Sequence, residues 1–251
     1  MSFIFKITTT TSPQTFVIPC GNAGAFNATV NYGDGTGSQT VTAYNDSNLT
    51  HSFATAGQHT ITIDGTFPNV KFYDNTASRV LVDEVVDLGD VGWVDFYRAF
   101  RECTNLTAFN VGTANTSSVT TIQDMFANCS SLTALDLSTL DVSSVLSMVF
   151  VFANCTSLTS LNLGGFDTSS VSNMSYMFVG CSSLTNLDVK HFDVSNVTNG
   201  TSFLSGSNNA LTTTAYNELL EAWAAQDVQP NVPWHFGDAQ YTVEAIADWY
   251  S

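Results

Sequence analysis

The chain has 251 residues, of which 44% are hydrophobic and only 11% are charged, and its formal net charge is −16 at pH 7. This length is enough to bury a sizeable core and to form about two structural units. Only six residues are Lys or Arg, and four of them fall between Lys71 and Arg101. Because no basic stripe is available to neutralise phosphates, the composition argues against nucleic-acid binding.

The first ten residues contain an apolar run that is too short for a signal peptide, and no later stretch approaches 18 consecutive apolar residues. We therefore expect no signal peptide in this chain and no membrane insertion. Either the chain is not secreted by that route, or a leader was removed from it.

Short segments rich in β-branched residues occupy the beginning of the chain. They are residues 3–8, 15–18, 28–32 and 59–63, and turn residues separate them. Glycines in the stretch Tyr32-Gly-Asp-Gly-Thr-Gly supply the positive φ angles of a tight turn. Residues 1–70 are therefore predicted to form a small all-β sandwich.

Two motifs in this segment resemble those of a known domain family. Asn31-Tyr-Gly-Asp-Gly35 is followed by a longer motif that begins at His51 and includes His59. The segment resembles the polycystic-kidney-disease (PKD-like) domain, which has a W-G-D-G turn and a later H-x-Y-x-x-x-G-x-Y/H-x-V-x-V strand. Tyr32 stands for the usual Trp and Phe53 for the usual Tyr. The resemblance implies a spacer or mounting module on an exported surface.

Four cysteines recur at a constant 26-residue interval, and neighbouring residues recur with them. The residues in phase are Cys103, Cys129, Cys155 and Cys181, together with Phe100, Phe126, Phe152 and Phe178. A fixed period of this length is typical of a solenoid, in which each repeat stacks on the next. Residues 71–207 are predicted to form this solenoid, with a degenerate first repeat that lacks the cysteine.

Each repeat is predicted to contain a strand and a short helix. Leucines at relative positions 1, 4 and 6, as in residues 132–137, fit the frame of a leucine-rich repeat and predict a short strand in a parallel sheet. Residues 166–178 place Val171, Met174 and Met177 at helical spacing, which predicts a turn and then a helix. The predicted fold class is therefore α+β: an all-β sandwich, then a leucine-rich-repeat solenoid with a parallel sheet on one side and short helices on the other.

The repeat pattern ends near residue 207. Beyond it, residues 213–226 set Tyr216, Leu219, Leu220 and Trp223 on one helical face. Residues 208–251 are therefore predicted to form a helical C-terminal cap that covers the last repeat.

The repeats also carry a family resemblance. Their consensus, M-F-x-x-C-x-S-L-T-x-L-D-L-S-x-F-D-T-S-x-V-x-x-M, extends over about residues 74 to 207. It resembles the BspA-type leucine-rich repeat, which is also met as a 26-residue "surface protein" repeat in bacteria and their phages. Residues 211–223 and 234–241 resemble the C-terminal cap of those proteins. The resemblance implies adhesion or receptor binding on the exterior of a cell or virion.

The repeated cysteines are expected to be free packing residues. Equivalent Cα atoms of neighbouring repeats are expected about 5 Å apart, with side chains that point in parallel and not toward each other. The four cysteines and four phenylalanines would then form one buried structural ladder. Two alternatives stay open. One is a disulfide, which the separation permits, and the other is a zinc site, which would need ligands that converge on a point.

Strand residues that point away from the core form the predicted binding surface. Its central row is Asn110, Asp136, Asn162 and Asp188, with Lys190 close to the last of them. Such a row can hydrogen-bond a glycan or hold Ca²⁺ through its oxygen atoms. The alternative is that the row is polar only because any solvated sheet face is polar. No aromatic residue joins it, which makes it weaker as a hot spot for stacking.

Aromatic residues gather at the two ends of the repeat region. Trp249 and Tyr250, at the C-terminus, are predicted to contact a neighbouring subunit, so a homo-oligomer is among the expectations. The alternative is that most of these aromatic residues belong to the cores of the two caps.

The four histidines are the residues to check for a catalytic motif. They are His51, His59, His191 and His235. None has a nucleophile or a carboxylate pair at a known motif spacing, and no G-x-S-x-G, H-E-x-x-H or phosphate-loop sequence occurs. We expect no enzyme activity, no catalytic residue, no metal site and, apart from the Ca²⁺ considered above, no cofactor.

These features predict a non-enzymatic binding protein on a virion surface or in an extracellular setting. The favoured form is a phage tail or capsid appendage whose partner is a host cell-surface protein or glycan, or another virion subunit. Free thiols and the missing leader favour assembly in a cytoplasm. Two alternatives stay open: the ectodomain of a bacterial cell-surface adhesin, and a purely architectural subunit of a virion or filament.

Overall fold

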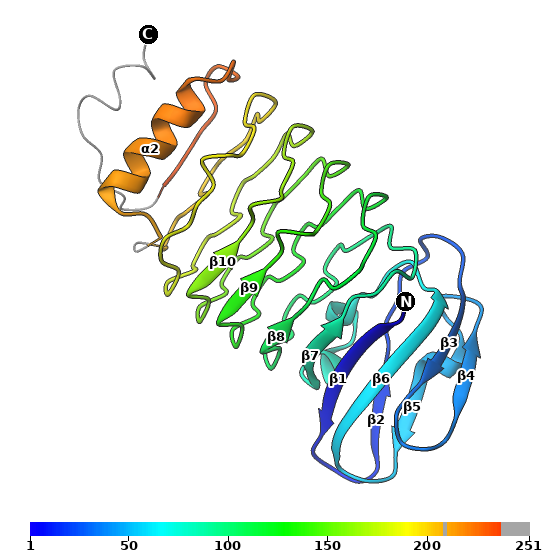
Figure 1. The fold of residues 1–251 in the computed structure, drawn as a ribbon. Helices are drawn as coiled ribbons and strands as arrows, with labels where there is room; N and C mark the ends of the chain where they lie inside the picture. The colour runs from blue at the N-terminus through cyan, green and yellow to red at the C-terminus, as the bar shows by residue number, and fades with distance from the viewer. Residues whose placement is uncertain (208–209, 237–251) are drawn as a thin grey trace.

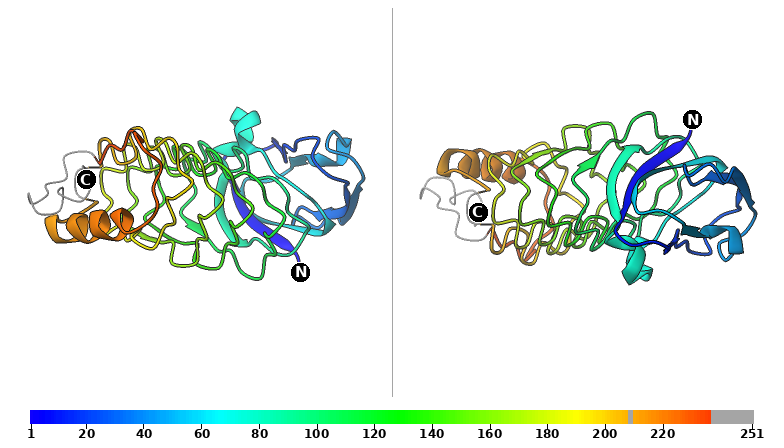
Figure 2. Two further views of the ribbon diagram at one scale, coloured as in Figure 1. Left: turned by 90° about the horizontal axis from the view of Figure 1, so that it is seen from above. Right: turned by 90° about the horizontal axis from the view of Figure 1, so that it is seen from below.

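The structure, a computed structural model, describes residues 1–207 and 210–236. The chain is elongated, with the N-terminal strands at one end and a helix at the other (Figures 1 and 2). The strands are β1 (Phe3–Thr9), β2 (Gln14–Val17), β3 (Asn27–Asn31), β4 (Ser38–Val41), β5 (Thr50–Phe53), β6 (Gly57–Thr66), β7 (Val82–Asp87), β8 (Ala108–Phe109), β9 (Ala134–Asp136) and β10 (Ser160–Asn162). The helical segments are η1 (Ser47–Leu49), η2 (Phe72–Asp74), α1 (Thr76–Arg79) and α2 (Thr213–Ala224).

Six strands form a mixed sheet in the order β4-β3-β6-β1-β7-β8. Its pairings are antiparallel except the one between β7 and β8, which is parallel. Strands β2 and β5 form a separate antiparallel pair. The segments predicted as strands near the N-terminus overlap β1, β2, β3 and β6. The sheet continues through β7 into β8, so it crosses the boundary that was predicted at residue 70.

An aromatic core lies between the N-terminal strands. Residues alternate along β1, so that Phe3, Phe5 and Ile7 are fully buried. The ring of Phe5 lies 6.2 Å from that of Phe16 in β2 and 5.6 Å from that of Phe72 in η2. Full burial of a side chain of this size stabilises the fold by about 1.5–3 kcal/mol. The core therefore holds the two sheets of this region together.

Trp93 joins this core to the repeats. Its buried ring packs edge-on against Phe3 at 5.1 Å and lies 4.9 Å from the ring of Phe96. Its indole N–H donates a hydrogen bond to the carbonyl of Leu88 at 3.1 Å. The polar atom of a large buried side chain is thus satisfied, as buried polar groups generally require. The first repeat is therefore continuous with the N-terminal region.

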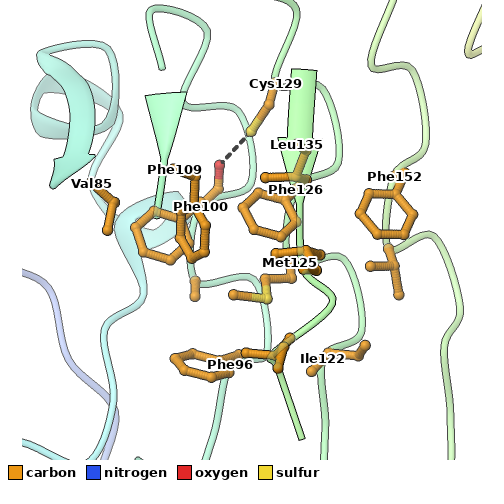
Figure 3. Packing of buried hydrophobic residues seen from close by; sticks show 14 of the residues in the cluster. Val85, Phe96, Phe100, Phe109, Ile122, Met125, Phe126, Cys129, Leu135 and Phe152 are labelled. Atoms are coloured by element: carbon orange, nitrogen blue, oxygen red, sulfur yellow. Dashed lines mark hydrogen bonds between the residues drawn. The ribbon is translucent and has the colours of Figure 1, made fainter. Parts of the chain in front are cut away.

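The 26-residue repeats lie side by side along the long axis (Figure 1). On one side, β9 and β10 pair in parallel and in phase, so that Ala134 is the partner of Ser160 and Asp136 that of Asn162. Inside the stack, the rings of Phe100, Phe126, Phe152 and Phe178 follow one another at 5.9, 6.0 and 5.4 Å. Figure 3 shows the rings of Phe100, Phe126 and Phe152 in one row. The four phenylalanines therefore occupy equivalent positions in successive repeats.

The predicted fold class is wrong. The described residues between α1 and α2 contain no helix, and the strands of the repeats are only two or three residues long. The sheets are mixed and do not close on themselves. The chain is thus mostly sheet and turns, with one long helix near its C-terminus, and it is not the α+β leucine-rich-repeat solenoid that the periodicity predicted.

Hydrogen bonds between repeats replace the predicted helices. Where a helix was expected, the N–H groups of Met174, Tyr176 and Phe178 donate to the next repeat at 2.9–3.0 Å. An α-helix needs these same N–H groups for carbonyls four residues earlier. Tyr176 also adopts a φ of 59°, in the left-handed region, and Gly180 a φ of 70°. The segment is therefore a series of turns.

The cysteines form a second buried column, and the described structure contains no disulfide between them. Cys103, Cys129, Cys155 and Cys181 are free and fully buried. The Sγ of Cys129 donates to the carbonyl of Phe100 at 3.1 Å, a bond drawn in Figure 3, and Cys155 does the same to Phe126. Burial raises the pKa of the Cys181 thiol to about 12. These thiols behave as small apolar residues with one weak donor.

Helix α2 covers the last repeat, as predicted for residues 213–226. Thr212 caps its N-terminus, because its hydroxyl oxygen accepts a hydrogen bond from the N–H of Ala215 at 3.2 Å. Its buried face carries Tyr216, Leu219, Leu220 and Trp223. The indole N–H of Trp223 donates to the carbonyl of Val189 at 3.2 Å. The prediction of a C-terminal helix is therefore confirmed.

Two further predictions concern the C-terminal subunit contact and membrane insertion. Trp249 and Tyr250, the predicted subunit contact, lie outside the described residues. Across the described ranges we find no helical segment with the length and hydropathy of a membrane span.

Candidate binding surface

The predicted row lies on the exposed side of the repeat strands. Asn110 follows β8, while Asp136 and Asn162 are the last residues of β9 and β10. Asn110 pairs in parallel with Asp136, which in turn pairs with Asn162. Asp188 is exposed in the following repeat. We call these four residues the Asx row.

Each member of the Asx row closes a turn. The side-chain Oδ1 atoms of Asn110, Asp136 and Asn162 accept a hydrogen bond from the N–H group two residues later, at 2.9, 3.0 and 3.1 Å. Asp188 makes a longer contact of this kind with Lys190, at 3.4 Å. Such Asx turns satisfy main-chain donors at the end of a strand. The row thus has a structural role, and each side chain keeps one further polar atom for a neighbour or for solvent.

The row alternates between an amide and a carboxylate. Hydrogen bonds from Ser138 and from the Asn162 side chain hold the pKa of Asp136 below its ordinary value. Neighbouring members lie about 5 Å apart, so adjacent carboxylates would repel each other. An amide between two carboxylates avoids this repulsion and donates to one of them.

Asp87 extends the row at its N-terminal end. Its Oδ1 accepts a hydrogen bond from the N–H of Gly89 at 2.8 Å, which is the same turn. It lies beside the next turn, because a Cβ added to Gly112 would approach its Oδ1 to 2.0 Å. The sequence did not reveal Asp87, because the position in phase with Asn110 is Glu84 and not Asp87.

A groove lies at the C-terminal end of the row, between the last repeat and α2. We call it the end groove, and its volume is about 180 Å³. It is lined by Asn186, Leu187, Asp188, Val189 and Lys190 of the last repeat and by Ala215, Glu218 and Leu219 of α2. The Nζ of Lys190 lies 3.2 Å from Glu218 Oε2, and both side chains are about half exposed, at 51% and 53%. The groove therefore combines buried apolar residues with charged groups that solvent reaches.

The described residues do not supply a ready metal centre. No group of three or more His, Cys, Asp or Glu side chains converges within residues 1–207 and 210–236. In the Asx row, amides separate the carboxylates. We therefore assign no residue to Ca²⁺.

The histidines of the N-terminal motifs are packed among aromatic rings. His51 stacks on Tyr32 at 4.2 Å, and its Nε2 lies 2.6 Å from Asp34 Oδ2. His59 stacks on Phe53 at 3.9 Å, and its Nε2 lies 3.0 Å from Thr9 Oγ1. The sequence did not predict the contact between His51 and Asp34. In both cases the stacking and the polar contact fix the ring within the sheet region.

A further column of residues at the 26-residue interval was not predicted from the sequence. Arg98, Asp124, Phe150 and Tyr176 occur at the same 26-residue interval as the cysteines. All four have left-handed φ angles of 56–59°. We call them the Arg98 column. The interval itself could have revealed the column, but its residue types differ from one repeat to the next.

Comparisons with known proteins give a family for the repeat region. No curated protein and no solved structure matches the chain. Residues 94–223, slightly more than half of the 251 residues, match the family described as "Mycoplasma protein of unknown function, DUF285". The match begins just after Trp93 and ends at Trp223, in α2. The chain therefore belongs to the DUF285 family.

Proposed function

We propose that the protein is a non-enzymatic binding protein displayed on a virion exterior, as a phage tail or capsid appendage. It recognises a host cell-surface protein or glycan through the Asx row and the end groove. The observation that carries the proposal is the position of the groove, where the polar row of the repeats meets α2.

The chemistry of the end groove favours a ligand unit with both apolar and polar faces. Leu187, Val189 and Leu219 are buried residues of its lining. Lys190 and Glu218 offer a donor and an acceptor in solvent. Drug-sized ligands occupy pockets of about 300–1,000 Å³. A groove of about 180 Å³ therefore suits one sugar ring, or one side chain of a protein ligand.

The fixed geometry of the row supports recognition along its length. Each side chain is held by its turn, so less rotamer freedom is lost when a ligand binds. The row offers acceptors and amide donors about 5 Å apart. A repeating glycan, or an extended stretch of a protein, can make one contact per repeat.

The proposal is tested by binding of the purified full chain to a glycan array and to intact candidate host cells. Lys190→Ala and Glu218→Ala each remove a polar group of the groove, and we expect each to weaken binding about three- to tenfold. Lys6→Ala and Glu84→Ala are the matched control, because Lys6 and Glu84 form an ion pair of 2.7 Å in the N-terminal sheet. We expect these controls to bind like the wild type.

Two results would overturn the proposal. One is the absence of binding to every glycan and every cell tested. The other is binding that Lys190→Ala and Glu218→Ala leave unchanged, since the ligand would then not use the end groove.

A further inference from the structure

The Arg98 column lies on the other side of the core from the Asx row. Phe109 of β8 points inward and packs against Phe100 and Phe126, at 5.2 and 4.9 Å (Figure 3). The strand and the segment that contains Phe100 thus face each other across these rings. Arg98 and Asn110, which are not part of this ring cluster, therefore mark two separate surfaces of the stack.

Main-chain hydrogen bonds keep the column in register. The N–H of Arg98 donates to Gln123 at 3.0 Å, that of Asp124 to Val149 at 3.0 Å, and that of Phe150 to Ser175 at 3.3 Å. Each acceptor immediately precedes the next member of the column. Consecutive members are therefore about 5 Å apart, and the column spans about 15 Å.

The Arg98 guanidinium shares its neighbouring carboxylate, that of Asp124, with Arg101. It lies over the rings of Tyr73 and Tyr97, at 5.1 and 4.8 Å, and 35% of its side chain is exposed. Its nearest carboxylate is Asp124, whose Oδ2 is 3.9 Å from Nε. The buried Nε of Arg98 has no hydrogen-bond partner among the described residues. The two tyrosines thus position this cation without using its donors.

The neighbouring cations are already paired. Arg79 forms an ion pair with Glu102, Arg101 forms one with Asp124, and Lys71 Nζ lies 3.2 Å from Asp95. Four cations thus meet three carboxylates in this cluster, and Arg98 is the surplus charge. In a chain with a net charge of −16, this cluster holds four of the six basic residues. It is therefore the region best suited to an acidic group of a partner.

The other end of the column is aromatic. The rings of Phe150 and Tyr176 stack at 4.7 Å with an interplanar angle of 12°. Both residues are partly exposed, whereas the core rings Phe126, Phe152 and Phe178 are fully buried. The pair is therefore additional to the core and offers apolar surface to a partner. Tyr and Arg are enriched among the residues that dominate binding at protein interfaces.

We propose that the Arg98 column is a docking surface for an extended polypeptide segment of a partner protein. A carboxylate of the segment pairs with the Arg98 guanidinium through two parallel N–H···O bonds, and an apolar side chain rests on Phe150 and Tyr176. These two contacts are about 10–15 Å apart. At about 3.3 Å per residue, the acidic and apolar residues of the segment are about three to five positions apart. A partner that lacks either feature leaves one end of the column unfilled.

The test uses a random peptide library, selected against the immobilised full chain. We expect enriched peptides to carry Asp or Glu about three to five positions from an aromatic or aliphatic residue. Synthetic versions of these peptides are then measured by fluorescence anisotropy. We expect Arg98→Glu to weaken their binding at least about tenfold, and Tyr176→Ser to weaken it about three- to tenfold. Lys6→Ala is the control and should bind like the wild type.

Arg98→Lys separates geometry from charge. Lysine keeps the positive charge but loses the planar fork, so we expect a loss smaller than that of Arg98→Glu. When the selection is repeated on Arg98→Glu, the enriched peptides should no longer share an acidic residue. A variant that is only less stable would not change which residues are enriched. Thermal unfolding of each variant shows whether it is folded.

Three results would overturn this assignment. The first is a selection with no enrichment of acidic residues. The second is peptide binding that Arg98→Glu and Tyr176→Ser do not change. The third is binding to acidic oligosaccharides, with the same dependence on Arg98, in place of peptides, because the occupant would then be a glycan.

Discussion

The Sγ of Cys155 donates a hydrogen bond to the main-chain carbonyl of Phe126, in the preceding repeat, at 3.1 Å. Cys181 repeats this contact with Phe152 at 3.0 Å. After the last cysteine, Ser207 takes the same position, and its hydroxyl donates to Phe178 at 2.5 Å. The column thus needs a small side chain with one donor, and a thiol or a hydroxyl can supply it.

Cys155→Ala and Cys155→Ser should therefore differ. Alanine leaves a small void and removes the donor, so we expect a loss of about 1–2 kcal/mol in the free energy of unfolding. Serine keeps a donor, as Ser207 shows, and should cost less than alanine. Urea unfolding followed by circular dichroism measures both values. A serine variant less stable than the alanine variant would contradict this role for the thiol.

The buried thiols should make stability fall at alkaline pH. Burial raises the pKa of Cys181 from 9.0 to about 12, and it raises those of Cys129 and Cys155 well above the ordinary value. In the unfolded chain these groups ionise near pH 9, whereas the folded chain keeps their protons. Their contribution is therefore complete below about pH 9 and is lost as the pH rises toward 12.

Urea midpoints measured between pH 8 and 11 check this expectation. The variant Cys181→Ser lacks one of these groups and should show a shallower alkaline decline than the wild type. If the urea midpoints of the two proteins fall equally with pH, ionisation of Cys181 does not lower the stability. In the same pH range, alkylation of the native chain should be slow at the buried cysteines, since the thiolate is the reactive form.

Asp34 should contribute to stability on the acid side. Partial burial raises its pKa, but hydrogen bonds from Thr36 and His51 outweigh this effect and lower the pKa from 3.8 to about 2. The unfolded chain therefore takes up this proton at a higher pH than the folded chain does. The contribution is present above about pH 4 and is lost as the pH falls toward 2.

Asp34→Asn removes this titration. Its unfolding free energy should fall less steeply than that of the wild type between pH 4 and 2, as chemical denaturation at several pH values would show. Asp90→Asn, at an exposed position, is the control and should keep the wild-type slope. An Asp34→Asn curve parallel to that of the wild type would refute this contribution of Asp34 to stability.

Gly112 should tolerate substitution less well than Gly35. Both have a positive φ, of 58° and 86°. A Cβ at Gly112 would lie 2.0 Å from Asp87 Oδ1, whereas a Cβ at Gly35 would have no atom within 4 Å. Gly35→Ala should cost about 1 kcal/mol from the backbone alone, and Gly112→Ala should cost more because the Asp87 turn must also move. Thermal unfolding compares the two, and equal losses would show that Asp87 adjusts freely.

The constant interval between the cysteines allowed the positions of the ladder residues to be predicted from the sequence. Residues of one type at one interval must occupy equivalent environments, so Phe126 and Phe152 stack at 6.0 Å. The helical face of Tyr216, Leu219 and Trp223 was equally clear, because the helix buries only that face.

The short helices were predicted wrongly because their apolar spacing has a second explanation. Met174 and Met177 are buried in a pair of turns that flank the left-handed residue Tyr176. Nothing in tyrosine itself signals such a φ angle. Asn128, Asn154 and Gly180, which are also left-handed and in phase with one another, did carry a signal, since Asn and Gly favour that region.

The candidate sites were only partly visible in the sequence. The Asx row could be predicted because its members alternate with buried strand residues. Two features depend on contacts that no local pattern shows: the end groove, which α2 forms with the last repeat, and the surplus charge of Arg98, which exists because Arg79 and Arg101 have carboxylate partners.

Antibody labelling of purified particles and of intact cells tests the central proposal, display on an exterior surface, most directly. Electron microscopy with an antibody against the chain should show label on the outside of the particles, or of unpermeabilised cells if a cell carries the protein. Permeabilised cells serve as the control for antibody access. Label found only inside permeabilised cells throughout growth would contradict an exterior binding protein.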